Sequence, residues 1–268
     1  MIIDFHTHIF PNKIASKTIE LLSQKGGIPP YSDGTADGLT AAMKKAGVDI
    51  SVTLPVLTNP KSFEGVNGFA LSVNEKHKDE DRRLISFGAI HPACDDIEGK
   101  MRWLSDAGFL GVKIHPDYQE TYIDDEGYVR ILKSAYEYDL TVVTHAGPDI
   151  AYPDTVRCTA ERARRLIEKV PYARLVLAHF GGIDMLDEFM ELPKNECLYF
   201  DTAYVLRYLT REKFSEILDR LGAERILFAT DSPWSDIERD VKILKSFSLD
   251  KNTEERLFSL NAKKLLRI

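Results

Sequence analysis

The chain has 268 residues, of which 44% are hydrophobic and 29% are charged, and its formal net charge is −7. Acidic and basic residues are interspersed, so there is no basic patch for a nucleic-acid partner. No apolar run approaches the roughly 20 residues of a membrane span, and the first residues lack the basic and apolar parts of a secretory signal. Cys94, Cys158 and Cys197 form no CxxC pair, which favours reduced thiols. We therefore expect a cytoplasmic globular protein.

Short apolar runs alternate with helix-like segments along the chain. The eight runs are residues 2–8, 49–55, 84–91, 110–116, 140–147, 174–180, 197–202 and 225–231. Several consist almost entirely of Val, Ile, Leu and Phe, as is typical of parallel strands buried on both faces. Amphipathic spacing predicts helices over 36–47, 128–139, 161–170, 210–222 and 253–266. Asp37, Thr210 and Thr253 are the expected caps, and residues 12–35 are expected to be an insertion ending in a loop.

Eight strands alternating with helices predict an α/β fold, a single (β/α)8 TIM barrel over residues 1–268. Length alone would suggest two domains of roughly 150 residues, but such barrels reach about 250 residues as one domain. The structural alternative is a doubly wound open sheet. That fold would normally place a glycine-rich phosphate loop after the first strand, where this chain has the sequence HTHIFPN.

Polar side chains end most of the predicted strands, where barrel enzymes place their catalytic residues. In chain order they are His6, His8, His91, Lys113, His115, His145, His179 and Asp231. His6 and His8 share one face of the first strand because side chains alternate with period two. A single buried histidine usually has a structural role, but His6, His8, His145 and Asp231 together offer nitrogen and carboxylate ligands suited to Zn²⁺ or a similar divalent ion. The remaining histidine, His77, is expected on the surface.

The motifs taken together resemble one known family. HxH on strand one, histidines on strands five and six, and an aspartate on strand eight resemble the amidohydrolase superfamily. The segments GVKIHPDYQ (111–119), LAHFGG (177–182) and ATDSPW (229–234) are similar to its amidohydrolase-related branch, which includes aminocarboxymuconate-semialdehyde decarboxylase. The resemblance extends from Asp4 to about Trp234.

The resemblance implies one divalent metal, most often zinc, held by His6, His8, His145 and Asp231. His179 would then lie near the metal-bound water and take its proton or orient it, a role that suits an imidazole. A bound metal lowers the pKa of water to about 7 and so supplies a nucleophile. The Gly181–Gly182 pair either lets a substrate approach the backbone or forms a turn.

Other residues are assigned to substrate binding or to support of the metal ligands. A strand-four lysine bridges two metals in binuclear relatives, but we favour substrate binding or ligand support for Lys113 and His115. His91 either lines the pocket or belongs to a strand-ending turn, and Trp234 is expected to wall the site by packing. Three further residues, Arg157, Tyr204 and Arg207, would either contact an acidic substrate or be surface groups in water.

Two chemistries fit this arrangement. The first is hydrolysis, in which metal-activated water attacks an amide, ester or lactone carbonyl, with His179 or Asp231 moving the proton. The second is non-oxidative decarboxylation of an unsaturated or aromatic acid. The compact chain slightly favours hydrolysis of a small molecule. A non-catalytic barrel that binds a metal or a small ligand is the third alternative. Such a protein would lose part of the ligand set, but no ligand position is replaced in this chain. We expect a small-molecule substrate, and the resemblance allows a homodimer.

Overall fold

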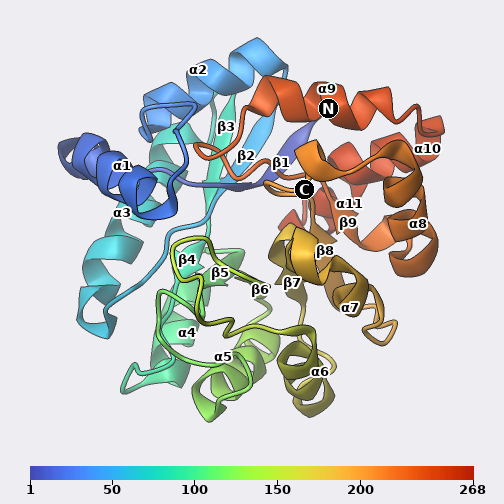
Figure 1. The fold of residues 1–268 in the computed structure, drawn as a ribbon. Helices are drawn as coiled ribbons and strands as arrows, with labels where there is room; N and C mark the ends of the chain where they lie inside the picture. The colour runs from blue at the N-terminus through green and yellow to red at the C-terminus, as the bar shows by residue number, and fades with distance from the viewer. The chain divides into compact units, whose positions relative to one another are not determined.

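A computed structural model describes all residues from Met1 to Ile268. The chain forms two compact units, whose elements are labelled along the chain in Figure 1. Residues 1–53, 73–85 and 201–268 form the first unit, and residues 54–72 and 86–200 form the second. None of the helices combines the length and the apolar character that crossing a membrane requires.

The first unit contains a three-stranded sheet. Its strands, in spatial order, are β1 (Ile3–Thr7), β2 (Ile50–Thr53) and β3 (Arg83–Ser86), and β1 and β2 run parallel. The short strand β9 (Ile226–Leu227) leads into a segment beside β1, because the Phe5 N–H donates to the Phe228 carbonyl at 2.9 Å. The helices of this unit are α1 (Asn12–Gly26), α2 (Ala36–Ala46), α8 (Arg211–Leu221), α9 (Ile237–Ser246), α10 (Lys251–Glu255) and α11 (Asn261–Leu266).

The second unit contains a parallel sheet. Its strands, in spatial order, are β4 (Gly88–Ala89), β5 (Gly111–Ile114), β6 (Thr141–Thr144), β7 (Leu175–Leu177) and β8 (Leu198–Asp201, of which Asp201 belongs to the first unit). Its helices are α3 (Phe63–His77, of which residues 73–77 belong to the first unit), α4 (Ile97–Asp106), α5 (Glu126–Glu137), α6 (Ala160–Lys169) and α7 (Leu186–Met190). Consecutive strands pair in parallel because a helix returns the chain between them.

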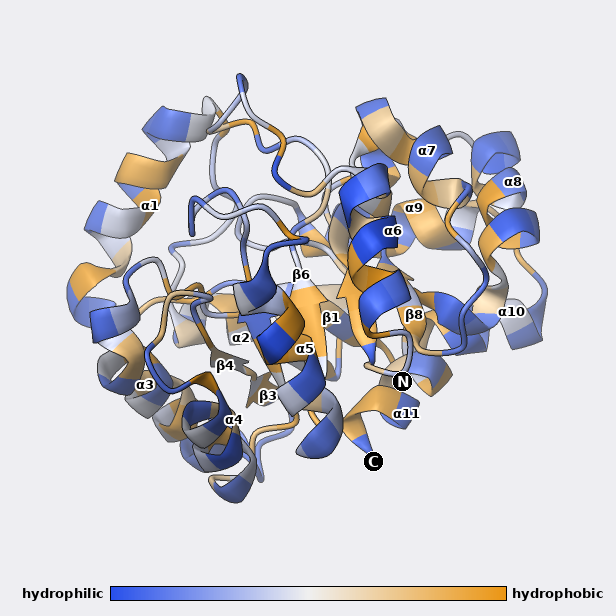
Figure 2. Cartoon of the chain, turned by 90° about the horizontal axis from the view of Figure 1, so that it is seen from below, coloured by the Kyte–Doolittle hydropathy of each residue, from blue (hydrophilic) through white to orange (hydrophobic).

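The burial pattern explains why these segments become strands and helices. Every residue of β1, β2 and β5 through β8 is buried, which matches their nearly continuous apolar sequences. Helix α6 instead buries one face, with Ala163, Leu166 and Ile167, and begins where the Thr159 hydroxyl accepts the Arg162 N–H. Figure 2 shows this contrast between hydrophobic strands such as β6 and helices such as α6 and α8, which carry both colours.

Each of the five predicted helix ranges is helical in the structure, which also contains α3, α4, α7 and α9, for which the sequence analysis gave no range. The third apolar run, 84–91, is divided into β3 and β4, so eight predicted runs correspond to nine strands. Residues 12–35 contain α1, which the sequence analysis did not predict. Only Ala15 and Ile19 of this helix are buried, so its apolar spacing is a weak signal.

Two of the predicted helix caps are wrong. Helix α2 is capped by Thr35, whose side chain accepts the Gly38 N–H, and not by Asp37. Helix α10 is capped by Asp250, whose side chain accepts the Thr253 N–H. Thr253 therefore lies within the helix and is not its N-cap. Thr210 caps α8 as predicted.

The surface position predicted for His77 is also wrong. Its exposed fraction is 2%, and its Nδ1 atom lies 2.8 Å from the Glu80 carboxylate. The charged neighbours in the sequence suggested a solvated face, but this position of α3 faces the interior. The three cysteines are free thiols in the structure.

Candidate metal centre

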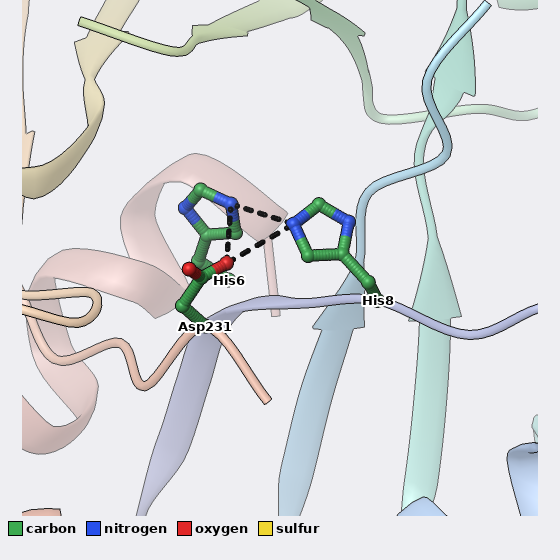
Figure 3. Close-up of side chains that lie close together, drawn as sticks. All are labelled: His6, His8 and Asp231. Atoms are coloured by element: carbon green, nitrogen blue, oxygen red, sulfur yellow. Dashed lines mark hydrogen bonds and ion pairs between the residues drawn. The ribbon is translucent and has the colours of Figure 1, made fainter. Parts of the chain in front are cut away.

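The first unit brings His6, His8 and Asp231 together by backbone pairing. The Asp231 N–H donates to the His6 carbonyl at 2.8 Å, and the His8 N–H donates to the Ser232 carbonyl at 2.6 Å. The segment after β9 therefore lies in register with the end of β1. Figure 3 shows the three side chains converging on one point from these two segments.

The distances within this cluster fit a divalent metal. The Nε2 atoms of His6 and His8 are 3.1 Å apart, and Asp231 Oδ1 lies 3.5 Å from the first and 3.1 Å from the second. Ligands bonded to tetrahedral Zn²⁺ at about 2.0–2.1 Å lie about 3.3–3.4 Å from one another. The cluster therefore offers a suitable donor set for such an ion, with two imidazole nitrogens and one carboxylate oxygen at the required spacing.

A residue to which the sequence analysis gave no role supports this cluster. Asp201, at the end of β8, is fully buried, and its Oδ2 atom lies 2.9 Å from His6 Nδ1. A carboxylate behind a histidine fixes the ring orientation and the tautomer, which leaves Nε2 as the electron-pair donor. The signal for Asp201 was its position at the end of the apolar run CLYFDT.

Asp4 fastens the same two segments to each other. Its carboxyl group accepts the Thr230 N–H at 2.9 Å, the Thr230 hydroxyl at 2.6 Å and the His6 N–H at 3.3 Å. Burial raises the pKa of Asp4 to about 8. Its bonds join β1 to the residue before Asp231, so Asp4 helps to position the cluster.

Several residues just beyond the strands have unusual backbone conformations. His179, Tyr204 and Asp231, which follow β7, β8 and β9, have φ angles of 61°, 66° and 68°. Residues other than glycine rarely adopt positive φ. Such conformations cost about 1–3 kcal/mol each and are concentrated at functional sites. Two of these three residues were predicted as catalytic from the sequence.

The second unit brings His115 and His145 together with Asp149, which the sequence analysis did not select. The rings of His115 and His145 stack with centroids 4.4 Å apart and planes 5° apart. Asp149 Oδ2 lies 3.4 Å from His115 Nε2 and 3.9 Å from His145 Nε2. These three residues form a second group with potential metal-binding atoms.

A buried carboxylate and an arginine lie next to this second group. Asp117 Oδ1 accepts the Arg157 N–H at 3.3 Å and lies 3.6 Å from Arg157 Nη1, while Oδ2 lies 3.9 Å from His145 Nε2. Burial and, to a lesser extent, the negative charge of Asp149 raise the pKa of Asp117 to about 6. Arg157 thus has an acidic partner in its own chain.

Gln119 holds the loop after β5, and therefore His115, in place. Its side-chain oxygen accepts the His115 N–H at 3.1 Å and the Tyr128 hydroxyl at 2.8 Å. Its side-chain nitrogen donates to the carbonyls of Leu57 and Ile90 at 2.8 and 2.7 Å. A buried amide with all these bonds is a rigid support. Lys113, on β5, is 1% exposed.

The loop after β7 places His179 near His145 and explains the glycine pair. The rings of His179 and His145 have centroids 4.9 Å apart. The Gly182 N–H donates to the His179 carbonyl at 2.8 Å, as in a turn. A Cβ atom on Gly181 would lie 2.1 Å from the Phe189 ring, so this glycine is required for packing.

His91 and Trp234 lie in tight turns. His91 Nδ1 accepts the Ala93 N–H at 3.1 Å, which is the strand-ending turn that the sequence allowed, and burial lowers the pKa of His91. The Trp234 N–H donates to the Asp231 carbonyl at 2.8 Å, which closes the turn that holds Asp231. The substrate-binding roles of these two residues stay predictions.

The chain belongs to the amidohydrolase family, because the amidohydrolase family model matches residues 3–268. The resemblance inferred from the motifs is confirmed. Members of this superfamily are enzymes that use a divalent metal, and their fold is the TIM barrel. The predicted (β/α)8 fold class is therefore confirmed, while the assignment of residues 1–268 to a single domain stays a prediction.

Solved structures with this fold include both reaction types considered above. The 2,6-dihydroxybenzoate decarboxylase from Rhizobium is 17% identical, with a TM-score of 0.71 over 99% of this chain and 98% of that one. The 5-carboxyvanillate decarboxylase from Novosphingobium aromaticivorans, solved with bound manganese, is 14% identical, with a TM-score of 0.72 over 100% and 97%. A proposed 2-pyrone-4,6-dicarboxylic acid hydrolase from Pseudomonas putida is 17% identical, with a TM-score of 0.68 over 99% and 97%. No curated protein sequence matches the chain.

Proposed function

We propose that this chain is a metal-dependent enzyme that acts on a small aromatic or otherwise unsaturated carboxylic acid. The observation behind the proposal is the cluster of His6, His8 and Asp231, whose ligand atoms lie within 3.5 Å of one another. The proposed substrate class is supported by the names of the three similar structures, each of which refers to an aromatic or pyrone carboxylic acid.

His6, His8 and Asp231 would hold the metal, and we assign His145 as a further ligand from the family pattern. His145 follows β6, and residues at the C-terminal ends of different strands act together in barrel enzymes. Zn²⁺ suits this set of nitrogen and oxygen donors. When bound, the ion supplies a Lewis acid that polarises a substrate oxygen.

The side chains around the metal would orient its ligands and move protons. Asp201 holds His6 Nδ1, so that His6 Nε2 stays directed at the cluster. We assign proton transfer to the His179 imidazole and to the Asp231 carboxylate, because both groups can gain and lose a proton. Lys113 and His115 would bind the substrate or support the ligands.

Non-oxidative decarboxylation is the first candidate reaction. The bond between the carboxyl carbon and the ring or alkene carbon breaks, its electron pair stays on that carbon, a proton joins the carbon, and CO₂ leaves. Two of the three similar structures are decarboxylases, and the alignments cover 97–98% of them. Their nearly full coverage weakens the argument that a compact chain favours hydrolysis.

Hydrolysis of a lactone or related carbonyl is the second candidate reaction. Water adds across the carbonyl carbon and the leaving oxygen or nitrogen, and the proton passes to that leaving atom. The Pseudomonas putida structure supports this candidate, because its name describes the hydrolysis of a pyrone dicarboxylic acid. Both candidates share the metal cluster and the acidic class of substrate.

Products from a panel of aromatic and pyrone carboxylic acids distinguish the two reactions. Each acid is incubated in D₂O with metal-loaded protein, and the products are analysed by mass spectrometry and NMR. Decarboxylation replaces the carboxyl group by deuterium and releases CO₂, whereas hydrolysis adds the mass of water. Turnover of neither kind across the panel would contradict the proposal.

A His179→Gln variant provides the matched control for this assay. We expect it to retain the metal and to lose turnover by about 10²–10⁴-fold, the range of a general acid–base group. A variant with full turnover would remove His179 from the mechanism. A variant that loses its metal would instead assign His179 to metal binding.

A further inference from the structure

Arg207 lies in an aromatic slot formed by the loop after β8. Its guanidinium carbon is 3.8 Å from the centre of the Tyr204 ring and 5.3 Å from that of Tyr208. Its Nε donates to the Tyr204 carbonyl at 3.2 Å, and its Nη2 lies 3.4 Å from the Trp234 carbonyl. Stacking and these two bonds fix the plane of the guanidinium.

This half-buried guanidinium has no carboxylate within ion-pair distance, unlike the half-buried Arg162 and Arg239. Arg162 lies 2.7 Å from Asp124, and Arg239 lies 3.2 Å from Asp240. The charge of Arg207 reaches Asp240, but that carboxylate bonds to Ser235 and Arg239. A partly buried positive charge without an ion pair of its own is costly unless an anion binds to it.

The slot adjoins the candidate metal centre along the chain. Tyr204 lies three residues after Asp201, and its N–H donates to the Thr230 carbonyl at 3.2 Å. Trp234 lies three residues after Asp231 and is bonded to its carbonyl. Burial and the hydrogen bond with Tyr208 raise the pKa of Tyr204 to about 12, and the negative charge of Asp231 adds a smaller effect. Arg207 is therefore held by the same two loops that position Asp201 and Asp231.

We propose that Arg207 binds a carboxylate of the substrate beside the cluster of His6, His8 and Asp231. The guanidinium has more N–H donors than its two carbonyl contacts use, and a planar fork matches a carboxylate. The ring of Tyr204 supports it from one side and keeps that fork in one orientation. This inference rests on the proposed function for its ligand class, and it makes Arg207 a specificity-determining residue.

The test compares carboxylates with their neutral amides. Binding of benzoate, phthalate and maleate to the metal-loaded protein is measured by calorimetry, beside benzamide, phthalamide and maleamide. Charge-assisted bonds to a half-buried group predict that Arg207→Gln weakens carboxylate binding about 10–100-fold and leaves amide binding unchanged. Arg207→Lys keeps the charge but not the planar guanidinium, so its affinity for carboxylates should lie between those of the wild type and the Arg207→Gln variant. Arg211→Gln, an exposed arginine four residues further on, is the matched control.

Three outcomes would overturn this inference. They are a wild-type protein that prefers none of the carboxylates to its amide, an Arg207→Gln variant with wild-type carboxylate affinity, and equal losses in the Arg207 and Arg211 variants. Circular dichroism and metal content measured on each variant identify a general folding defect. Selective loss of carboxylate binding in a protein without turnover would support the role of Arg207 while contradicting the proposed function.

Discussion

The two units each contain a group of two histidines and an aspartate, but the groups are built differently. In the first unit the Nε2 atoms of His6 and His8 converge with Asp231, and Asp201 lies behind His6. In the second unit the rings of His115 and His145 are stacked, and Asp149 lies 3.4–3.9 Å from their Nε2 atoms.

This difference indicates which group is organised as a metal centre within its own unit. Convergent electron pairs with a carboxylate behind one ring are the usual arrangement of metal-bound histidines. Stacked rings instead direct their nitrogen atoms side by side, toward a shared hydrogen-bonding or charged group. The first group is therefore the better candidate for a metal site built within one unit. In the second group, His115 and Asp149 are better suited to contact a polar substrate, apart from the role proposed for His145.

The largest effect should come from removing a ligand of the first group. We expect His6→Ala to lower the metal content from about one ion per chain to near zero, because one histidine is lost from the donor set. His115→Ala should keep a metal content close to that of the wild type. Elemental analysis of protein purified without chelators measures both. If His6→Ala kept its metal and His115→Ala lost it, the metal would belong to the second group and not to the first.

A smaller effect should follow from changing the carboxylates beside each group. Asp201→Asn keeps the size of the side chain but removes the charge behind His6, and substitutions of this kind lower metal affinity about 10–100-fold. Asp149→Asn is the matched change in the second unit, and we expect it to leave affinity nearly unchanged. Competition with a chromophoric chelator measures both constants. Greater loss in the Asp149 variant would assign the metal to the second unit.

Much of the fold and of the first group could be predicted from the sequence, for a physical reason. Polar residues at the ends of apolar runs, such as His6 and Asp231, are costly to bury unless they are hydrogen-bonded, paired or bound to a metal, so their positions are informative. The fold class followed from eight apolar runs separated by amphipathic segments. Both signals are local and need no knowledge of packing.

The residues that the sequence analysis missed depend on contacts between distant segments. Asp201 supports His6 across 195 positions of the chain, and no spacing rule connects them. His77 stands among charged residues and yet is buried by the packing of α3. Asp149 lies in a loop, where an aspartate is common for reasons of turn formation alone.

The last prediction concerns the stability of the backbone that carries the second group. Gly147 lies between His145 and Asp149, has a φ of 80°, and a Cβ atom there would lie 1.7 Å from the Gly181 carbonyl oxygen. Gly147→Ala should therefore destabilise the protein by about 2–4 kcal/mol, through strained φ together with backbone overlap. Gly27→Ala is the matched control, since Gly27 has a φ of 66° and nothing within 4 Å of its Cβ position. It should cost only the strain, about 1–2 kcal/mol, in chemical denaturation. Equal losses of unfolding free energy in the two variants would show that the loops of Gly147 and Gly181 separate readily. The second group would then be less rigidly held than the stacked rings of His115 and His145 indicate.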